Sequence, residues 1–134
     1  MRVLVIDDDE SNRKLLKSMV AKMGECDTAS NGKDALSAFK KAWEDWRPYD
    51  LVFLDILMPE MDGCQVLIKI RELERKKGIP DKLKAKIIMV SAASQKEMVM
   101  TCLRDGCDDF MVKPLETRLM ISKIRHFGLL PEEN

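Results

Sequence analysis

The sequence predicts an α/β fold in which five strand–helix units build one parallel sheet with helices on both faces. Short apolar runs of strand length recur along the 134 residues, and each is followed by apolar positions at helical spacing. No repeat, low-complexity tract or linker interrupts this alternation. Strands that alternate with helices form parallel sheets through right-handed crossovers. A hydrophobic content of 46% is sufficient for one core without metals or disulfides.

The first two units are predicted from the N-terminal third of the chain. Residues 3–6 form an apolar run that ends in an acidic stretch. Apolar side chains at helical spacing follow this stretch up to Gly24, where we expect the first helix to end. A weaker strand is expected at 26–29, and the turn signal at 31–32 precedes a second amphipathic helix.

The third unit contains the stretch around which the chain is organised, VFLDILMPEMDG. Residues 51–54 have the length and the β-branched and aromatic content of a strand buried on both faces, and this strand stops at Asp55. A stiff, proline-containing loop follows, in which Asp62 is placed to cap the next helix. We expect that helix to end in the charged segment 74–86, because the segment contains a glycine and a proline.

The last two units complete the predicted sheet. The apolar run 87–90 predicts a fourth strand, and a helix from about 94 to 104 follows it. Residues 110–112 predict a fifth strand, and a final helix spans roughly 117–127. The apolar residues of the fourth helix cover about 200° of arc, which is wider than one core-facing stripe. Part of that helix is therefore expected to be exposed.

Composition and charge exclude several classes of protein. Lys and Arg number 23 and so do Asp and Glu, so no long-range field favours nucleic acid or an anionic membrane. No apolar stretch is long enough to span a membrane, which predicts a soluble, cytoplasmic protein. The four cysteines contain no CxxC pair and are interpreted as reduced thiols. We assign the domain to residues 1–128 and a C-terminal tail to 129–134.

Polar side chains stand where four of the predicted strands end. They are Asp7, Asp8, Asp55, Ser91 and Lys113. Strand ends of a parallel sheet share one edge, and carboxylates gathered there need a cation or must take up protons. Oxygen ligands favour Mg²⁺. Asp55 can then act as a nucleophile that becomes an acyl phosphate, while Lys113 and Ser91 hold the phosphoryl oxygens.

The ordered motifs VLVIDD, NGKDAL, YDLVFLDILMPEMDG, IIMVSA and GCDDFMVKP resemble the receiver domain of two-component response regulators. The resemblance covers nearly the whole chain and includes the stand-alone chemotaxis-type receivers. It implies a flavodoxin-like, doubly wound (βα)5 fold with sheet order 2-1-3-4-5, an order for which the chemotaxis receiver is a standard example. The long second helix and the charged segment before the fourth strand resemble receivers associated with hybrid kinases.

The resemblance implies a metal site and a phosphoacceptor. Asp55 corresponds to the phosphoacceptor and Asp8 to a direct Mg²⁺ ligand. Asp7 corresponds to a partner that acts through water, and the backbone carbonyl of Leu57 to a further ligand. Mg²⁺ is thus the implied cofactor, with Asp7, Asp8, Asp55 and Leu57 as the metal set.

The resemblance also implies a switch. Ser91 corresponds to the hydroxyl that follows the phosphoryl group, and Lys113 to the lysine that pairs with it. Phe110 corresponds to the aromatic residue whose rotamer reports the change. The Lys113–Pro114 peptide bond is expected to be cis.

Together these assignments predict a phosphorylation-controlled switch that is not itself an enzyme. Its partner is a histidine kinase or a histidine phosphotransfer protein. Output is expected through the face formed by the fourth helix, the fifth strand and the last helix, from a monomer or a weak phosphorylation-dependent dimer. Autodephosphorylation is expected to be slow, because Leu57 and Ala93 cannot orient a water molecule.

Other function classes remain open alternatives. An aspartate-nucleophile phosphohydrolase should carry DxDx[TV] after the first strand, where this chain has DDDES. A flavin carrier would wrap a phosphate in that same loop, and the acidic residues would repel it. The closest alternative is a pseudo-receiver, an interaction module of the same fold that is never phosphorylated. The acidic residues, Ser91 and Lys113 argue against it.

Four residues also have a purely structural interpretation. Judged by its apolar neighbours alone, Phe110 is a core residue. Trp43 and Trp46 are expected to be packing residues at the end of an amphipathic helix. His126 is interpreted as structural, since an imidazolium near a helix C-terminus favours the helix dipole.

Overall fold

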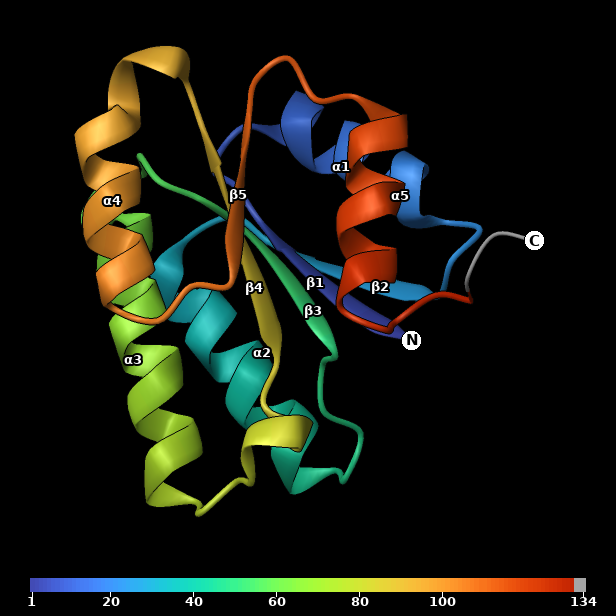
Figure 1. Ribbon diagram of the computed structural model, residues 1–134. Coiled ribbons are helices and arrows are strands. Elements are labelled where there is room, and N and C mark those ends of the chain that lie inside the picture. The colour runs from blue at the N-terminus through green and yellow to red at the C-terminus, as the bar shows by residue number, and fades with distance from the viewer. Residues whose placement is uncertain (132–134) are drawn as a thin grey trace.

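Five strands form one parallel sheet in the order β2-β1-β3-β4-β5 (Figure 1). The strands are β1 (Arg2–Ile6), β2 (Glu25–Ala29), β3 (Leu51–Asp55), β4 (Lys86–Ser91) and β5 (Asp109–Val112). The computed structural model describes residues 1–131. The strand order implied by the resemblance is confirmed, and the predicted bounds of the third strand agree with β3.

Five helices cover the two faces of this sheet. They are α1 (Glu10–Val20), α2 (Gly32–Glu44), α3 (Gly63–Lys76), α4 (Lys96–Arg104) and α5 (Thr117–His126), with short 3-10 helices η1 (Asp81–Leu83) and η2 (Ala93–Gln95). Figure 1 shows α1 and α5 on one face and α2, α3 and α4 on the other. Of the residues that the structure describes, none belongs to a helix both long and apolar enough to cross a membrane.

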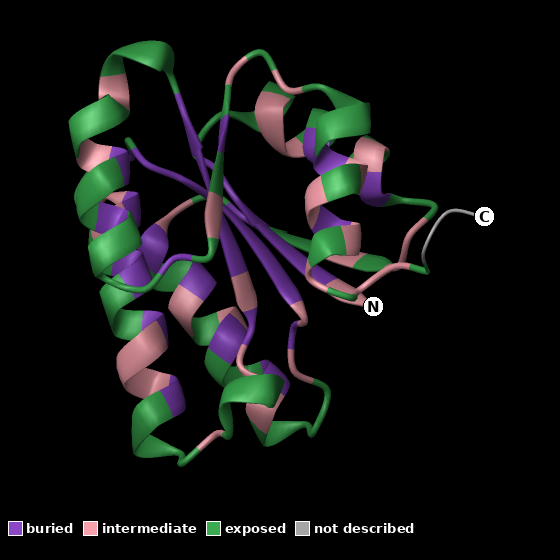
Figure 2. Ribbon diagram, in the orientation of Figure 1, coloured by how far each residue is buried: buried purple, intermediate pink, exposed green. Residues whose placement is uncertain are grey.

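Each face of the sheet has its own hydrophobic core, because successive side chains of a strand point to opposite faces. In β1, Val3 and Val5 belong to the core under α1 and α5, whereas Leu4 and Ile6 belong to the core under α2, α3 and α4. Figure 2 shows the central strands buried along most of their length. The sheet is therefore a rigid layer whose strand ends are fixed from both sides.

The parallel register brings the carboxyl ends of neighbouring strands to the same edge. Ile6 pairs with Leu54, the residue before Asp55, and Asp55 pairs with Val90, the residue before Ser91. The backbone N–H of Lys113 donates to the Ser91 carbonyl at 2.8 Å. Residues far apart in the sequence thus meet at one edge.

The loop after β3 is closed by a contact that only glycine permits. The Gly63 N–H donates to the Ile56 carbonyl at 2.7 Å, and a Cβ at Gly63 would overlap the Asp55 carbonyl oxygen. Asp62 then caps α3, accepting from the Gln65 N–H at 2.9 Å, as part of a reciprocal capping box. This geometry fixes the chain immediately after Asp55.

Two sequence-based expectations are wrong, namely the end of the first helix and the packing of Trp46. The first helix ends at Val20 rather than at Gly24, and a turn follows in which the Met23 N–H donates to the Val20 carbonyl at 2.9 Å. α3 ends at Lys76, inside the charged segment 74–86 as expected, although Glu74 in that segment is fully buried on the inner face of the helix. Trp46 is 83% exposed, with a positive φ after the end of α2, and so is not a packing residue. Trp43 does pack against the core.

A buried ion-pair network explains why Glu74 is tolerated in the interior. Arg71 Nη1 donates to Glu74 Oε1 at 2.6 Å and to the Ala85 carbonyl at 2.9 Å, and Glu74 Oε2 accepts from the Ala85 N–H at 2.8 Å. The same guanidinium reaches the Gly106 carbonyl at 3.0 Å and Asp108 Oδ2 at 2.8 Å. One side chain of α3 therefore ties the segment before β4 to the α4–β5 loop.

The cysteines do not all behave as predicted. Cys64 and Cys102, which are 38 residues apart, form a disulfide between α3 and α4. The interpretation of four reduced thiols is therefore wrong for this pair, whereas Cys26 and Cys107 are free thiols. Nothing in the local spacing of the cysteines indicated the pairing, because the contact depends on how the two helices are placed.

The predicted C-terminal tail is described only in part. Leu129 and Leu130 pack against the core under α1 and α5. Residues 132–134 lie outside the described residues.

Candidate functional site

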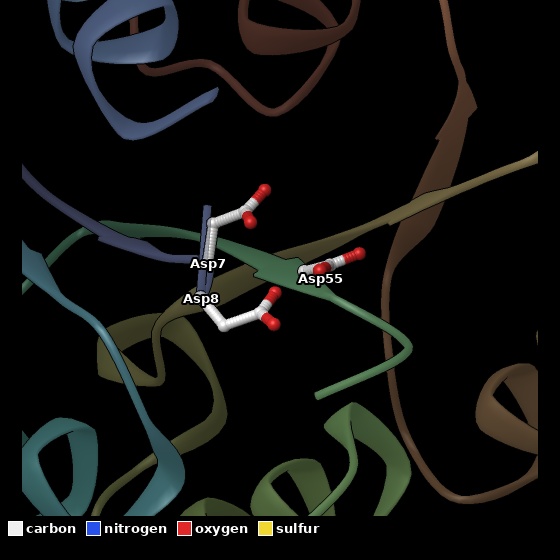
Figure 3. A group of neighbouring side chains, drawn as sticks. All are labelled: Asp7, Asp8 and Asp55. Atoms are coloured by element: carbon white, nitrogen blue, oxygen red, sulfur yellow. The ribbon is translucent and has the colours of Figure 1, made fainter. Parts of the chain in front are cut away.

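Three carboxylates meet at the carboxyl edge of the sheet. Asp7 and Asp8 follow β1, Asp55 is the last residue of β3, and one oxygen from each lies within 4.8 Å of the others. Figure 3 shows the three side chains extending from neighbouring strand ends. Asp7 and Asp55 are buried, whereas Asp8 is exposed. The predicted convergence of these three residues is confirmed.

The cluster holds more negative charge than its surroundings offset. Burial and the nearby charge of Asp7 raise the pKa of Asp55 to about 6, although the Lys113 ammonium acts in the opposite direction. Burial also raises the pKa of Asp7, against the hydrogen bond from the Asp9 N–H. Asp7 Oδ1 accepts that bond at 2.9 Å, but Asp7 Oδ2 has no hydrogen-bond partner among residues 1–131.

These residues fit a hard divalent cation. The donors are all oxygens, and a buried carboxylate oxygen without a partner is costly unless a proton or a cation satisfies it. Mg²⁺ takes one or two carboxylates and retains several waters, so an open, partly exposed cluster suits it. Asp7, Asp8 and Asp55 are the residues that would hold such an ion.

The remaining polar residues flank Asp55 on the side of β4 and β5. Lys113 Nζ lies 3.6 Å from Asp55 Oδ1, and the Lys113–Pro114 peptide bond is cis, as expected. Ser91, at the end of β4, is buried, and its Oγ has no hydrogen-bond partner within the described chain. One edge of the sheet thus carries the carboxylates, the Lys113 ammonium and the Ser91 hydroxyl, which has no hydrogen-bond partner among the described residues.

Leu57 and Phe110 lie at the margins of this site. Leu57 is exposed in the loop after β3, and the role of its carbonyl stays a prediction. Phe110 is 37% exposed on β5, with Lys123 Nζ 5.9 Å from its ring centroid, so its interpretation as a plain core residue is wrong. An aromatic ring at the surface of an edge strand has room to change rotamer.

Sequence reasoning missed a cavity beside the acidic cluster. It measures about 220 Å³ and lies between α1 and the chain after β5, where Asn12, Leu15 and Leu115 line it together with Asp7 and Lys113. Helical spacing marks Leu15 as an apolar position but does not say that it borders the site. The site therefore opens toward α1.

The raised pKa of Asp55 predicts that Asp55→Asn stabilises the metal-free domain near neutral pH. The folded state binds the Asp55 proton more tightly than the unfolded state, so the unfolding free energy falls as the pH rises from about 4 to about 6. The asparagine side chain of Asp55→Asn does not ionise, so this variant does not lose unfolding free energy over that pH range. We expect a gain of about 2 kcal/mol near pH 7 and none below about pH 4, measured by urea unfolding with a chelator present. Asp105→Asn, at an exposed carboxylate, is the control, and equal stabilities of Asp55→Asn and wild type near pH 7 would contradict the assignment.

Comparison with known proteins adds independent evidence. A family model described as response regulator receiver domain matches residues 3–125. The chain is 39% identical over 128 residues to hybrid signal transduction histidine kinase L of Dictyostelium discoideum, with 95% of this chain and 7% of that protein covered. It is 34% identical over 125 residues to the chemotaxis protein CheY of Bacillus subtilis, covering 92% and 93% of the two chains.

The solved structures agree with the sequence relatives. The crystal structure of the receiver domain of the histidine kinase CKI1 from Arabidopsis thaliana, complexed with Mg²⁺ and BeF₃⁻, matches at a TM-score of 0.80 and 31% identity. The match covers 95% of this chain and 89% of that chain. This chain spans well under two thirds of the length of the first curated relatives that it matches, in contrast to its near-complete coverage of CheY.

Proposed function

The chain belongs to the response regulator receiver domain family of two-component signalling, and from this premise we propose that it is a phosphorylation-controlled switch with Asp55 as phosphoacceptor. The donor is a histidine kinase or a histidine phosphotransfer protein. Receiver domains in general act as signalling switches rather than as enzymes. The proposal places this chain in the cytoplasm, with protein partners and no direct contact with nucleic acid or membrane.

The observation that carries the proposal is the asymmetric setting of Asp55. Carboxylates crowd one side, while Lys113 Nζ stands 3.6 Å from Asp55 Oδ1 on the other. The carboxylate attacks the phosphorus of a phosphohistidine, so that a P–O bond forms as the P–N bond breaks and the imidazole leaves. Mg²⁺, held by Asp7, Asp8 and Asp55 with the Leu57 carbonyl, would supply positive charge for the phosphoryl oxygens.

The residues beside Asp55 account for a conformational response. A phosphoryl group adds negative charge and strong acceptor oxygens. Lys113 pairs with this charge, and the unpartnered Ser91 hydroxyl donates to a phosphoryl oxygen. Movement of Ser91 is passed to Phe110 on the neighbouring strand and to α4, which follows β4. The equilibrium shifts by no more than the difference in binding between the two states.

The test is incubation with Mg²⁺ and acetyl phosphate, followed by intact-mass measurement. One phosphoryl adduct per chain is expected in the wild type, labile to base, and none in Asp55→Asn. Asp105→Asn, at a distant carboxylate, should be phosphorylated like the wild type. No adduct with acetyl phosphate or with a phosphohistidine donor would favour the phosphorylation-independent pseudo-receiver.

A slow loss of the phosphoryl group is expected once it is attached. Leu57 and Ala93 stand two residues after Asp55 and Ser91, and both are exposed without a polar side chain to orient water. Lack of general-base help typically slows such a step by ~10² to 10⁴-fold. Removal of the donor, with mass measured over time, should give a half-life longer than seconds, and Leu57→Asn should shorten it. A wild-type half-life of seconds or less would contradict this account.

Output is proposed through α4, β5 and α5. This face exposes five large apolar side chains, which are Met100, Leu103, Phe110, Val112 and Leu119. Exposed apolar residues gathered on one face mark an interaction surface, and methionine adapts to different partners. The predicted partial exposure of the fourth helix is confirmed, with Met100 at 49%.

Charged substitutions on this face should weaken phosphorylation-dependent association. Met100→Glu with Leu103→Glu should reduce dimer or target binding at least ~10-fold, since loss of one to two kcal/mol of contact energy has that effect. Leu83→Glu, at an exposed leucine on η1 outside this face, is the control. Sedimentation with Mg²⁺ and beryllofluoride measures self-association. If the double variant still folds and associates like the wild type, the output face lies elsewhere.

A further inference from the structure

One covalent bond joins the two helices that follow the site-bearing strands β3 and β4. Cys64 is the second residue of α3 and comes directly after Gly63, which closes the loop from Asp55. Cys102 lies in α4, the helix that follows β4 and its terminal Ser91. Their Cα atoms are 5.6 Å apart, within the usual range for a disulfide. The bond thus connects the phosphoacceptor loop to the proposed output face.

The disulfide adds a covalent tie to a helix that has few other anchors. This helix has nine residues, has no side-chain N-cap hydrogen bond and buries only Val99 and Cys102. Helices of this length are not stable by themselves and depend on tertiary contacts. One of these two buried residues carries the disulfide sulfur, so reduction removes a covalent tie and leaves α4 held by the packing of Val99, the Cys102 thiol and the partly buried Met98.

The two cysteines differ in access. Cys102 is fully buried, whereas Cys64 is partly exposed. An incoming thiolate therefore reaches the sulfur of Cys64 first, and the buried Cys102 is the leaving thiolate. The other two cysteines are poor exchange partners, since burial raises the pKa of Cys26 and of Cys107 to about 11 and leaves little thiolate.

We propose that Cys64 and Cys102 form a reversible redox site that locks α4 onto α3 when oxidised and releases it when reduced, with a small thiol such as glutathione as the exchange partner. A thiolate attacks Cys64, forming a mixed disulfide as the Cys64–Cys102 bond breaks and Cys102 takes up a proton. A second thiolate attacks the small-thiol sulfur of this mixed disulfide, yielding the small-molecule disulfide and a protonated Cys64. Two electrons pass to the protein, and the reverse sequence oxidises it. Disulfides that form in reducing compartments are usually transient or redox-sensing.

The redox site also couples to phosphorylation, in a step that rests on the proposed function. If the phosphoryl group moves α4 through Ser91, the disulfide opposes this movement because it fixes α4 relative to α3. The disulfide then weakens the binding of a ligand that mimics the phosphoryl group. Because linkage is reciprocal, the bound ligand makes the disulfide easier to reduce by the same factor as the disulfide weakens ligand binding. Oxidation of the cysteine pair then inhibits the conformational response to phosphorylation.

The first experiment measures the redox site without reference to phosphorylation. A Cys26→Ala, Cys107→Ala background leaves only the proposed pair, and it is equilibrated in buffers of varied glutathione to glutathione disulfide ratio. Alkylation and mass should show two free thiols or none, with half-oxidation set by the squared glutathione concentration divided by the glutathione disulfide concentration, since two glutathione molecules reduce one disulfide. Hydrogen exchange across 96–104 should be at least ~10-fold faster in the reduced form, with 10–20 unchanged, because local opening follows lost contacts. Cys64→Ser in this background should exchange like the reduced form in every buffer.

The second experiment adds Mg²⁺ and beryllofluoride and repeats the titration. At half-oxidation, the squared glutathione concentration divided by the glutathione disulfide concentration should fall roughly five-fold or more, a shift toward oxidising conditions at the lower end of typical coupling. A pair that never oxidises, or equal exchange of α4 in both forms, overturns the redox site. Bound beryllofluoride, seen by native mass, without a shift overturns the coupling. Absent beryllofluoride binding counts instead against the proposed function, and the first experiment still decides the redox site.

Discussion

Arg71→Met should destabilise the fold by about 3–5 kcal/mol, because it leaves the fully buried Glu74 carboxylate without its cationic partner. Methionine keeps the length, apolar stem and helix propensity of the arginine side chain, so the change removes the charge and its donors. The guanidinium also donates to two carbonyls and pairs with Asp108, and the segments before β4 and β5 lose these ties together. Urea unfolding followed by circular dichroism measures the loss.

Two further variants identify the cause of that loss. Arg75→Met, on the exposed side of the same helix, should change the unfolding free energy by no more than about 0.5 kcal/mol. Adding Glu74→Gln to Arg71→Met should recover part of the loss, since glutamine still accepts from the Ala85 N–H but carries no charge. A loss of less than about 1 kcal/mol in Arg71→Met would mean that Glu74 is not held by this pair.

Asp8→Ala should weaken Mg²⁺ binding by at least about 100-fold. Asp8 is the exposed member of the carboxylate cluster, so its removal costs a ligand but little packing. Loss of a residue that merely orients a ligand typically costs 10–100-fold in metal affinity, and loss of a charged ligand should cost no less. Titration calorimetry with MgCl₂ measures the affinity, and circular dichroism checks that the fold is retained.

Glu10→Ala is the matched control for this experiment. Glu10 is an exposed acid near Asp8, but it lies outside the cluster and pairs with Lys14 at 3.2 Å. Its removal should leave the Mg²⁺ affinity within about two-fold, the change expected for a screened surface charge. Equal affinities of wild type and Asp8→Ala would mean that the ion, if bound, uses other oxygens.

The sheet and the acidic cluster could be predicted because both depend on local pattern and on one topological rule. The run 51–54 is apolar on both faces and ends at a carboxylate, and it forms β3 with those bounds. Parallel strands place their carboxyl ends on one edge, so Asp7, Asp8 and Asp55 had to converge once the strands were assigned. The strand order itself came from the resemblance and not from the pattern.

What could not be predicted depends on contacts between distant residues. Glu74 lies in a charged run typical of a solvated segment. Its burial is tolerated because Arg71, which also pairs with Asp108 37 residues away, and the Ala85 N–H both contact its carboxylate. Cys64 and Cys102 carry no spacing signal for the same reason. Periodicity describes one face of one helix, whereas these interactions arise where two helices or a helix and a loop meet.

The position of the two tryptophans determines which optical signal can report on this protein. Both lie at the C-terminal end of α2 or just after it, and because α2 runs antiparallel to the strands, that end lies at the edge of the sheet opposite Asp55. Trp46, at 83% exposure, emits from water in the folded and the unfolded chain alike. Trp43, packed against the core, changes its surroundings only when the domain unfolds. Intrinsic fluorescence is therefore a probe of global unfolding, and occupancy of the acidic edge has to be followed by calorimetry or by a dye attached near β5.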